Sequence, residues 1–202
     1  MTQGLLLVIS APSGAGKSTV CGALAERCPG VVVSVSCTTR PPRGGEKNGR
    51  DYHFLSTEEF HRRLKAGEFI ESAQVHGSLY GTLEKPVADA LAKGRDVVLN
   101  IDTQGARSVK ERRPDCVRLF LLPPSWEALE ERLKKRAQDH PDVIAERLVN
   151  ARGEIARMPE YDYVVVNDRL EDAVRDVAAV LRAEKRRLSR SVDELRRLKF
   201  LQ

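Results

Sequence analysis

Short apolar runs alternate with amphipathic segments along most of the chain. Almost every position within a run is apolar, which is typical of parallel strands that are covered by helices on both faces. We therefore expect strands at residues 5–10, 31–36, 96–101, 117–122 and 163–166. Strands that alternate with helices in this way predict an α/β fold built around a five-stranded parallel sheet.

The amphipathic segments between these runs predict the helices that cover the sheet on both faces. Apolar residues recur in them at the spacing of one helix face, which predicts helices at residues 17–27, 86–92, 104–112, 126–136 and from 170 onward. In the fourth of these helices, the spacing places Trp126, Leu129 and Leu133 on one face, and we expect that face to pack on the core.

Two segments interrupt the alternation. Residues 37–84 begin with a polar stretch rich in Gly and Pro, and they predict a small lobe inserted between the second and third strands. Residues 134–157 are rich in Arg, Asp and Glu, and they predict a mobile helical lid. We therefore expect one domain, whose core comprises about residues 1–36, 85–133 and 158–202.

The predicted lobe contains a helix whose two ends are marked in the sequence. Ser56 is a typical capping residue, and Glu59 follows three positions later, as in a capping box. Leu55 and Phe60 occupy the two positions of a hydrophobic staple. Gly67 is typical of the residue that ends a helix, so the helix is expected between Ser56 and Gly67.

The composition is that of a globular protein that buries a sizeable core, since the 202 residues are 41% hydrophobic and 31% charged. No apolar run approaches the roughly 18 residues of a membrane-spanning helix, and the N-terminus lacks the features of a secretory signal. The cysteines have no paired spacing and predict small, reduced thiols at Cys21, Cys28, Cys37 and Cys116. We therefore expect a cytoplasmic protein with no membrane partner.

The net charge is concentrated at the C-terminus. Residues 182–202 hold eight Lys and Arg against three Asp and Glu, which equals the formal charge of +5 of the whole chain. A basic tail can serve as a nucleic-acid arm. Leucines at near-helical spacing favour a solvated amphipathic helix instead, so we expect no nucleic-acid partner.

A glycine-rich loop follows the first predicted strand and leads directly into a helix. Its residues are Ala11, Pro12, Ser13, Gly14, Ala15, Gly16, Lys17 and Ser18, followed by Thr19. Glycines let backbone N–H groups surround a phosphate, and the helix N-terminus favours negative charge there. Lys17 would reach the β- and γ-phosphates, and the Ser18 hydroxyl would bind Mg²⁺. Ala11 stands where the strict pattern has glycine, yet the other residues still predict ATP or GTP binding.

Further motifs follow the loop in a fixed order. They are SVSCTTRPPRGGE at 34–46, GRDYHF at 49–54, EFIE at 68–71, YGT at 80–82, IDTQG at 101–105 and VND at 166–168. Together with the loop, they closely resemble guanylate kinases of the bacterial type over nearly the whole chain. The resemblance implies an enzyme that transfers the γ-phosphoryl group of ATP to GMP, or to dGMP, and gives ADP and GDP.

The resemblance also implies which residues bind GMP. Arg40 and Arg43 would hold its phosphate, because guanidinium groups match a phosphate dianion, and the hydroxyls of Tyr52 and Tyr80 would assist. Glu71 would accept hydrogen bonds from guanine N1–H and N2–H₂. Ser36 and Thr82 would supply hydroxyls to the base, and such a polar pocket rejects other bases strongly.

By the same resemblance, further residues serve the metal and ATP. Asp102, at the end of a predicted strand, would face the metal or GMP, whereas Asn100 stands where the family commonly has a second acid. Asn167 would lie near adenine. The lid arginines would contact the ATP phosphates when the lid closes, and they are Arg132, Arg136 and Arg147.

Two other functions remain open from the sequence. A kinase of ribose 1,5-bisphosphate shares this broader fold, but it needs no carboxylate to recognise a base. A protein-interaction module derived from the family would lose the phosphate loop, whereas Lys17 and Ser18 are present. The sequence leaves the oligomeric state open between monomer and homodimer.

Overall fold

The protein is described by a computed structural model that covers residues 3–75, 77–136 and 141–200. Five strands form a parallel sheet in the order β2-β7-β1-β8-β9, with β1 in the centre. Their bounds are β1 Leu6–Ser10, β2 Val31–Val33, β7 Asp96–Asn100, β8 Val117–Leu122 and β9 Tyr163–Val166. The predicted parallel sheet is confirmed, although β2 is shorter than expected because the chain turns away toward a second sheet.

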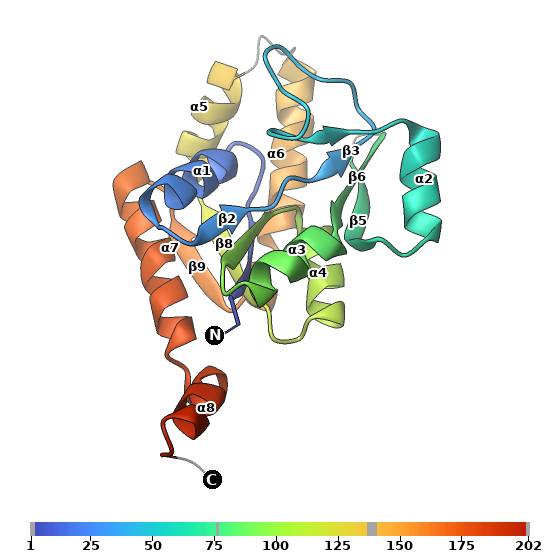
Figure 1. Ribbon diagram of the computed structural model, residues 1–202. Helices are drawn as coiled ribbons and strands as arrows, with labels where there is room; N and C mark the ends of the chain where they lie inside the picture. Colours follow the sequence, from blue (N-terminus) through green and yellow to red (C-terminus); the bar gives the residue numbers. More distant parts are fainter. Residues whose placement is uncertain (1–2, 76, 137–140, 201–202) are drawn as a thin grey trace.

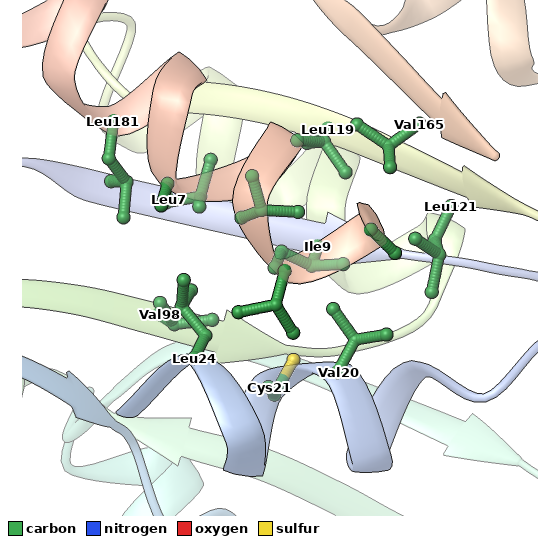
Figure 2. Close-up of a cluster of buried hydrophobic side chains, with 14 of the residues drawn as sticks. Leu7, Ile9, Val20, Cys21, Leu24, Val98, Leu119, Leu121, Val165 and Leu181 are labelled. Carbon is green, nitrogen blue, oxygen red and sulfur yellow. The ribbon is translucent and has the colours of Figure 1, made fainter. Parts of the chain in front are cut away.

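Helices cover both faces of the parallel sheet, as predicted. One face packs against α1 (Lys17–Arg27) and α7 (Leu170–Lys185), and the other packs against α3 (Glu84–Ala92) and α4 (Thr103–Arg112). Figure 2 shows the first of these layers, where Leu7 and Ile9 of β1 meet Val20 and Leu24 of α1.

The alternation along β1 explains how one short strand serves two layers. Leu7 and Ile9 point to the α1 and α7 side, whereas Leu6 and Val8 belong to the cluster on the α3 and α4 side. Successive side chains of a strand point to opposite faces, so a strand between two helical layers is apolar at every position. The central strand is therefore fixed, and the loop that follows it is held at the edge of the sheet.

A second, four-stranded sheet has the order β4-β3-β6-β5 and lies within the segment predicted as an inserted lobe. Its strands are β3 Cys37–Thr38, β4 His53–Phe54, β5 Phe69–Val75 and β6 Ser78–Leu83. The helix α2 (Thr57–Lys65) lies on the outer side of this sheet, away from the parallel sheet (Figure 1). Phe60 of α2 stacks on Phe69 of β5 with ring centroids 4.5 Å apart, which gives this sheet a small apolar centre of its own.

The ends of α2 agree with the sequence prediction. The Ser56 hydroxyl accepts a hydrogen bond from Glu59 N–H at 3.1 Å, as an N-cap does. The capping-box partner predicted at Glu59 is wrong, because the Glu59 carboxylate accepts from the guanidinium groups of Arg62 and Arg63 instead of from Ser56 N–H. Gly67 follows the helix with φ at 70°, a conformation that favours glycine and lets the chain turn into β5.

The helices α5 (Trp126–Arg136) and α6 (Pro141–Ile155) pack against each other beside the phosphate loop. Leu129 and Leu133 are fully buried in a cluster with Ala151 of α6. The prediction for Trp126 is wrong, because its side chain is 43% exposed and lies near the Arg152 guanidinium, 5.7 Å from the ring centroid. Trp126 is the first residue of α5 and lies ahead of the buried part of the helix.

The C-terminal helix predicted from residue 170 is interrupted after α7, and α8 (Leu188–Arg197) follows it. At the interruption the buried carboxylate of Glu184 pairs with Arg187 at 2.8 Å and accepts a hydrogen bond from Tyr163 Oη at 2.5 Å. The basic tail is also tied to the core, because Lys185 Nζ donates to the buried Asp96 Oδ2 of β7 at 2.9 Å. Among the described residues, no helix is long and apolar enough to cross a membrane. All four cysteines are free thiols, and only Cys28 is not fully buried.

Candidate active site

A cleft of about 330 Å³ lies between the phosphate loop and the second sheet. Predicted site residues from distant parts of the sequence line it together: Ala11, Pro12, Ser13, Gly14, Gly16, Lys17, Ser18, Ser36, Tyr52, Glu71, Tyr80 and Asp102. The cleft thus has a phosphate-loop end and an end formed by β5 and β6.

The glycines of the loop are required by its backbone and by its neighbours. Gly14 and Gly16 have φ of 90° and 88°, a left-handed conformation that other residues rarely adopt. A Cβ at Gly14 would lie 3.0 Å from Leu133 Cδ2, and one at Gly16 would lie 2.5 Å from Asn167 Nδ2. The loop therefore fits closely against α5 and the end of β9.

Asn167 holds the loop from behind, which sequence reasoning missed. Its buried amide Nδ2 donates to the carbonyl oxygen of Ala15 at 2.7 Å. The main-chain carbonyl oxygen of Asn167 accepts from Arg132 Nη2 at 3.0 Å. Asn167 and Arg132 also line a second cavity of about 360 Å³ on the other side of the loop, together with Thr19. If Asn167 lies near adenine, as predicted, the adenine would occupy this second cavity.

Lys17 begins α1 and lies among acidic groups. Its Nζ donates to the carbonyl oxygen of Ile101 at 2.5 Å. Burial lowers the pKa of the Lys17 ammonium, while the nearby carboxylates of Asp102, Glu154 and Glu71 act in the opposite direction. The ammonium is thus placed at the centre of the cleft, between the phosphate loop and the end of β7.

Ser18, Asn100 and Asp102 form the polar edge beside Lys17. The Asn100 amide donates to Ser18 Oγ at 3.2 Å. Asp102 Oδ1 accepts from Gly105 N–H at 2.7 Å and so caps α4 at its N-terminus. Sequence reasoning missed this capping role.

The Ser18 hydroxyl and the Asp102 carboxylate both line the cleft and offer the oxygen ligands that Mg²⁺ prefers, so the residues present fit this ion. Within the described ranges there is no cluster of three or more His, Cys, Asp or Glu side chains that could hold a metal by itself.

Glu71, Thr82 and Ser36 form a connected polar group at the other end of the cleft. Thr82 Oγ1 donates to Glu71 Oε1 at 2.7 Å and lies 3.3 Å from Ser36 Oγ. Glu71 is only 5% exposed, and burial raises the pKa of its carboxyl to about 7, although the Thr82 hydrogen bond opposes the shift. The group therefore combines a desolvated carboxyl with two hydroxyls, a set that can recognise both donors and acceptors.

Strand register explains why Glu71 and Thr82 meet. The two residues are direct partners in the antiparallel pair of β5 and β6, and cross-strand partners point to the same face. The register shifts between Phe69 and Glu71, as in a β-bulge. Bulges change the direction of a side chain, so Phe69 packs into the small core while Glu71 faces the cleft.

Of the four residues predicted to bind the GMP phosphate, Tyr52 and Tyr80 line the cleft, whereas Arg40 and Arg43 are not among its lining residues. Tyr52 and Tyr80 line the cleft with their rings edge to face and 6.0 Å apart. The Arg40 guanidinium lies 4.9 Å from the Tyr52 ring centroid and makes two hydrogen bonds to Glu46, at 2.6 and 2.7 Å. These hydrogen bonds hold the pKa of Glu46 down at about 2 and raise that of Arg40. Arg43 is exposed on the same loop.

The predicted lid arginines lie on two different helices. Arg132 is on α5 beside the second cavity, and Arg147 is on α6. Arg136 ends α5, and its side chain lies outside the described part of the chain.

Sequence reasoning also missed Glu154. This residue is on α6, lines the cleft, and accepts a hydrogen bond from Ser13 N–H at 3.3 Å through Oε2. No sequence signal distinguishes it from the other acids of this helix, because only the packing of α6 brings it to the loop.

The comparison with known proteins agrees with this geometry. The family model described as "Guanylate kinase" matches residues 3–184 of the chain. This chain belongs to the guanylate kinase family. A guanylate kinase of Symbiobacterium thermophilum is 49% identical over 94% of this chain and 90% of its own length. One of Thermotoga maritima is 46% identical over 98% of this chain and 96% of its own length.

A solved structure shows the same fold. The crystal structure of guanylate kinase from Anaplasma phagocytophilum has a TM-score of 0.81 with 38% identity, and the match covers 99% of this chain and 97% of that one. The chain is thus an enzyme of this kinase family, and its mixed α/β architecture is that of the family.

Proposed function

We propose that the protein transfers the γ-phosphoryl group of ATP to GMP, and likewise to dGMP, giving ADP and GDP. A phosphate oxygen of GMP attacks the γ-phosphorus, and the bond from that phosphorus to the bridging oxygen of ADP breaks. The observation that carries the proposal is the single cleft with the phosphate loop at one end and the buried Glu71, Thr82 and Ser36 group at the other. Such a reaction depends mainly on alignment and on charge stabilisation.

ATP would bind at the phosphate-loop end. Backbone N–H groups between Ala11 and Thr19 would surround its phosphates, with the N-terminus of α1 behind them. Lys17 would leave its contact with Ile101 O and neutralise charge on the transferred group. The adenine would enter the second cavity, beside Asn167.

Ser18 and Asp102 would hold Mg²⁺ together with the ATP phosphates, and the bound ion would neutralise charge on the β- and γ-phosphates. Asn100 contributes no negative charge, and its amide orients the Ser18 hydroxyl instead. Asp102 Oδ1 accepts from Gly105 N–H, so Oδ2 is the oxygen that would hold the ion.

GMP would bind at the other end, with its phosphate toward ATP. Arg40 and Arg43 would hold that phosphate, assisted by the hydroxyls of Tyr52 and Tyr80. Arg40 would exchange one or both of its contacts with Glu46 for the phosphate oxygens, which are equally suited to its fork of donors.

Guanine would be read by the buried polar group. The Glu71 carboxylate can accept from guanine N1–H and N2–H₂, and a hydroxyl of Thr82 or Ser36 can donate to O6. Adenine offers a different pattern and would leave these buried groups without partners, which is costly.

The lid would complete the site on the ATP side. Arg132, Arg136 and Arg147 would contact the phosphates when the lid predicted at 134–157 closes over the cleft, and residues 137–140 of that lid lie outside the described part of the chain. The lobe at 37–84 would bring GMP inward. Closure excludes water and prevents wasteful hydrolysis of ATP. The four free thiols favour a reducing compartment, so the proposal places the enzyme in the cytoplasm.

The two alternative functions are less well supported. A sugar bisphosphate has no base with which the Glu71 and Thr82 pair could form hydrogen bonds. An inactive interaction module would not need an intact phosphate loop packed on Asn167.

The test is ADP formation from ATP and Mg²⁺, with GMP, AMP, UMP and ribose 1,5-bisphosphate offered in parallel. We expect turnover with GMP and little with the others. Turnover with the sugar phosphate alone would refute the guanine pocket. No turnover with any acceptor, in a protein that still binds ATP, would support the interaction module.

A further inference from the structure

Gly105 lies in the first turn of α4, against the carboxylate of Glu71. Its backbone is not in the left-handed region, so its conformation does not require glycine. Within a helix, glycine is less favourable than alanine by about 1 kcal/mol. Local structure therefore gives no reason for a glycine here, and the reason must lie in what surrounds it.

The reason is steric. A Cβ at residue 105 would lie 2.8 Å from Glu71 Oε2, closer than real Cβ atoms come to other atoms. Its next neighbours would be Glu71 Cδ and Ile101 Cδ1, both at 3.3 Å, and these atoms would have to shift by only a few tenths of an ångström. Glu71 is thus the group for which the missing side chain leaves room.

The Glu71 carboxylate has little freedom to move aside. Its Oε1 accepts from Thr82 Oγ1 at 2.7 Å, and the side chain is almost completely buried. A methyl group at residue 105 would therefore rotate the carboxylate, and the rotation would disturb the Thr82 hydrogen bond as well as the direction of Oε2. Because the nearest atom belongs to the end of a side chain, the carboxylate moves before any backbone atom does.

We propose that Gly105 is a positioning residue for base selection: it leaves the space in which α4 and Thr82 together hold the Glu71 carboxylate toward the base. The inference rests on the guanine-reading role proposed above for Glu71. It assigns to α4 a part in choosing the acceptor, in addition to its capping by Asp102.

The chain contains a matched control for the same substitution. Gly22 lies in α1, and no atom would lie within 4 Å of a Cβ placed on it. Gly22→Ala therefore adds the same methyl group to a helix without touching the cleft.

The experiment compares Gly105→Ala, Gly22→Ala and the unchanged protein by steady-state kinetics with GMP and with AMP as acceptors. We expect Gly105→Ala to raise the KM for GMP by roughly 10- to 100-fold, the range expected when hydrogen bonds to a charged group are lost. The ratio of GMP to AMP turnover should fall in parallel, while the KM for ATP and the melting temperature stay near those of Gly22→Ala. An unchanged KM for GMP would overturn the proposal. An equal rise in the KM for GMP and the KM for ATP would overturn it as well.

A double substitution separates this positioning role from general damage. If Gly105 acts through Glu71, adding Gly105→Ala to Glu71→Ala should change the KM for GMP by less than about twofold. Additive effects would show that Gly105 acts independently and would overturn the inference. If Gly105→Ala alone failed to fold, folding of the double variant would support the same steric cause, and failure of both would refute it.

The single variant Glu71→Ala tests the proposed function on its own. Loss of base selection in Glu71→Ala but not in Gly105→Ala would refute only the inference about Gly105. Unchanged selection in Glu71→Ala would refute the guanine-reading role and the inference with it.

Discussion

The two ends of the cleft are built from different parts of the chain. At the phosphate-loop end, one strand, one turn and one helix supply the groups, and most of them are backbone amides shaped by Gly14 and Gly16. At the other end, the groups are side chains from β5, β6 and the loop before β3. The first end is suited to any nucleotide phosphate, because nucleotides with different bases carry the same phosphate groups. The second is suited to one base, because its side chains have a specific order of donors and acceptors.

The phosphate-loop end can be tested without the other by Lys17→Ala. Removing the ammonium should lower kcat by about 10²–10³-fold or more, as for other charged groups that stabilise a transferring group. The affinity for GMP, measured by calorimetry, should stay within a fewfold of the original. Lys85→Ala, an exposed lysine on α3, is the control. If GMP binding were lost together with kcat, the two ends would not be separable.

The desolvated Glu71 should make the guanine end costly for stability above neutral pH. The folded chain holds a proton on this carboxyl up to about pH 7, whereas an unperturbed glutamate has a pKa of 4.5. Its raised pKa therefore reduces stability as the pH rises from about 4.5 to 7. Glu71→Gln should raise the free energy of unfolding by about 2–3 kcal/mol at pH 8 and by much less at pH 5.

Denaturant unfolding at the two pH values measures this difference, with Glu146→Gln as an exposed glutamate control on α6. An equal effect of Glu71→Gln at both pH values would contradict the assigned pKa.

The same titration should appear in GMP binding. The proposed guanine contact requires the ionised Glu71 carboxylate, which loses its charge below about pH 7, while Asp102 and Lys17 are the charged groups that face it. The KM for GMP should therefore rise about tenfold for each pH unit below the pKa. The GMP phosphate also titrates near pH 6. Measuring the KM for GMP in Glu71→Gln over the same range isolates the contribution of the protein, and an identical pH profile in that variant would count against the assignment.

Asn167→Ala tests how far the phosphate loop depends on its support from β9. The substitution removes the hydrogen bond to Ala15 O and leaves a buried carbonyl without a partner. We expect a loss of about 1–3 kcal/mol in stability and a rise in the KM for ATP of roughly tenfold. The KM for GMP should change little. An effect on stability without any effect on the KM for ATP would show that the loop keeps its shape without Asn167.

Glu154→Gln should have the smallest effect, and in the opposite direction. The carboxylate approaches Ser13 N–H and lies near Lys17, where the phosphates of ATP are expected. Removing one negative charge should strengthen ATP binding by roughly two- to fivefold, because a partly exposed charge contributes about 1 kcal/mol or less. Binding of a non-hydrolysable ATP analogue measures this change against Glu146→Gln on the same helix. Weaker binding would mean that Glu154 supports the loop more than it repels phosphate.

Local sequence signals predicted the elements whose shape depends on neighbouring residues. The bounds of α1 and β8 agree with the predictions, and Ser56 and Gly67 delimit α2 as expected. These features arise from capping, from backbone conformations and from apolar runs, all of which act within a few residues. Trp126 shows the limit of such signals. Helix periodicity identifies which face of a helix is buried, but it does not show how much of the length of that face is covered by the rest of the protein.

The sequence by itself determined the parallel sheet, the phosphate loop and, through resemblance, the candidate residues for guanine binding. Only the tertiary structure decided that Asn167 supports the loop, that Glu154 reaches Ser13, and that Gly105 makes room for Glu71. Each of these contacts joins residues that are far apart in the chain. Their existence depends on how helices pack on a sheet and on the register of paired strands, and neither is encoded in the spacing of residues along one segment.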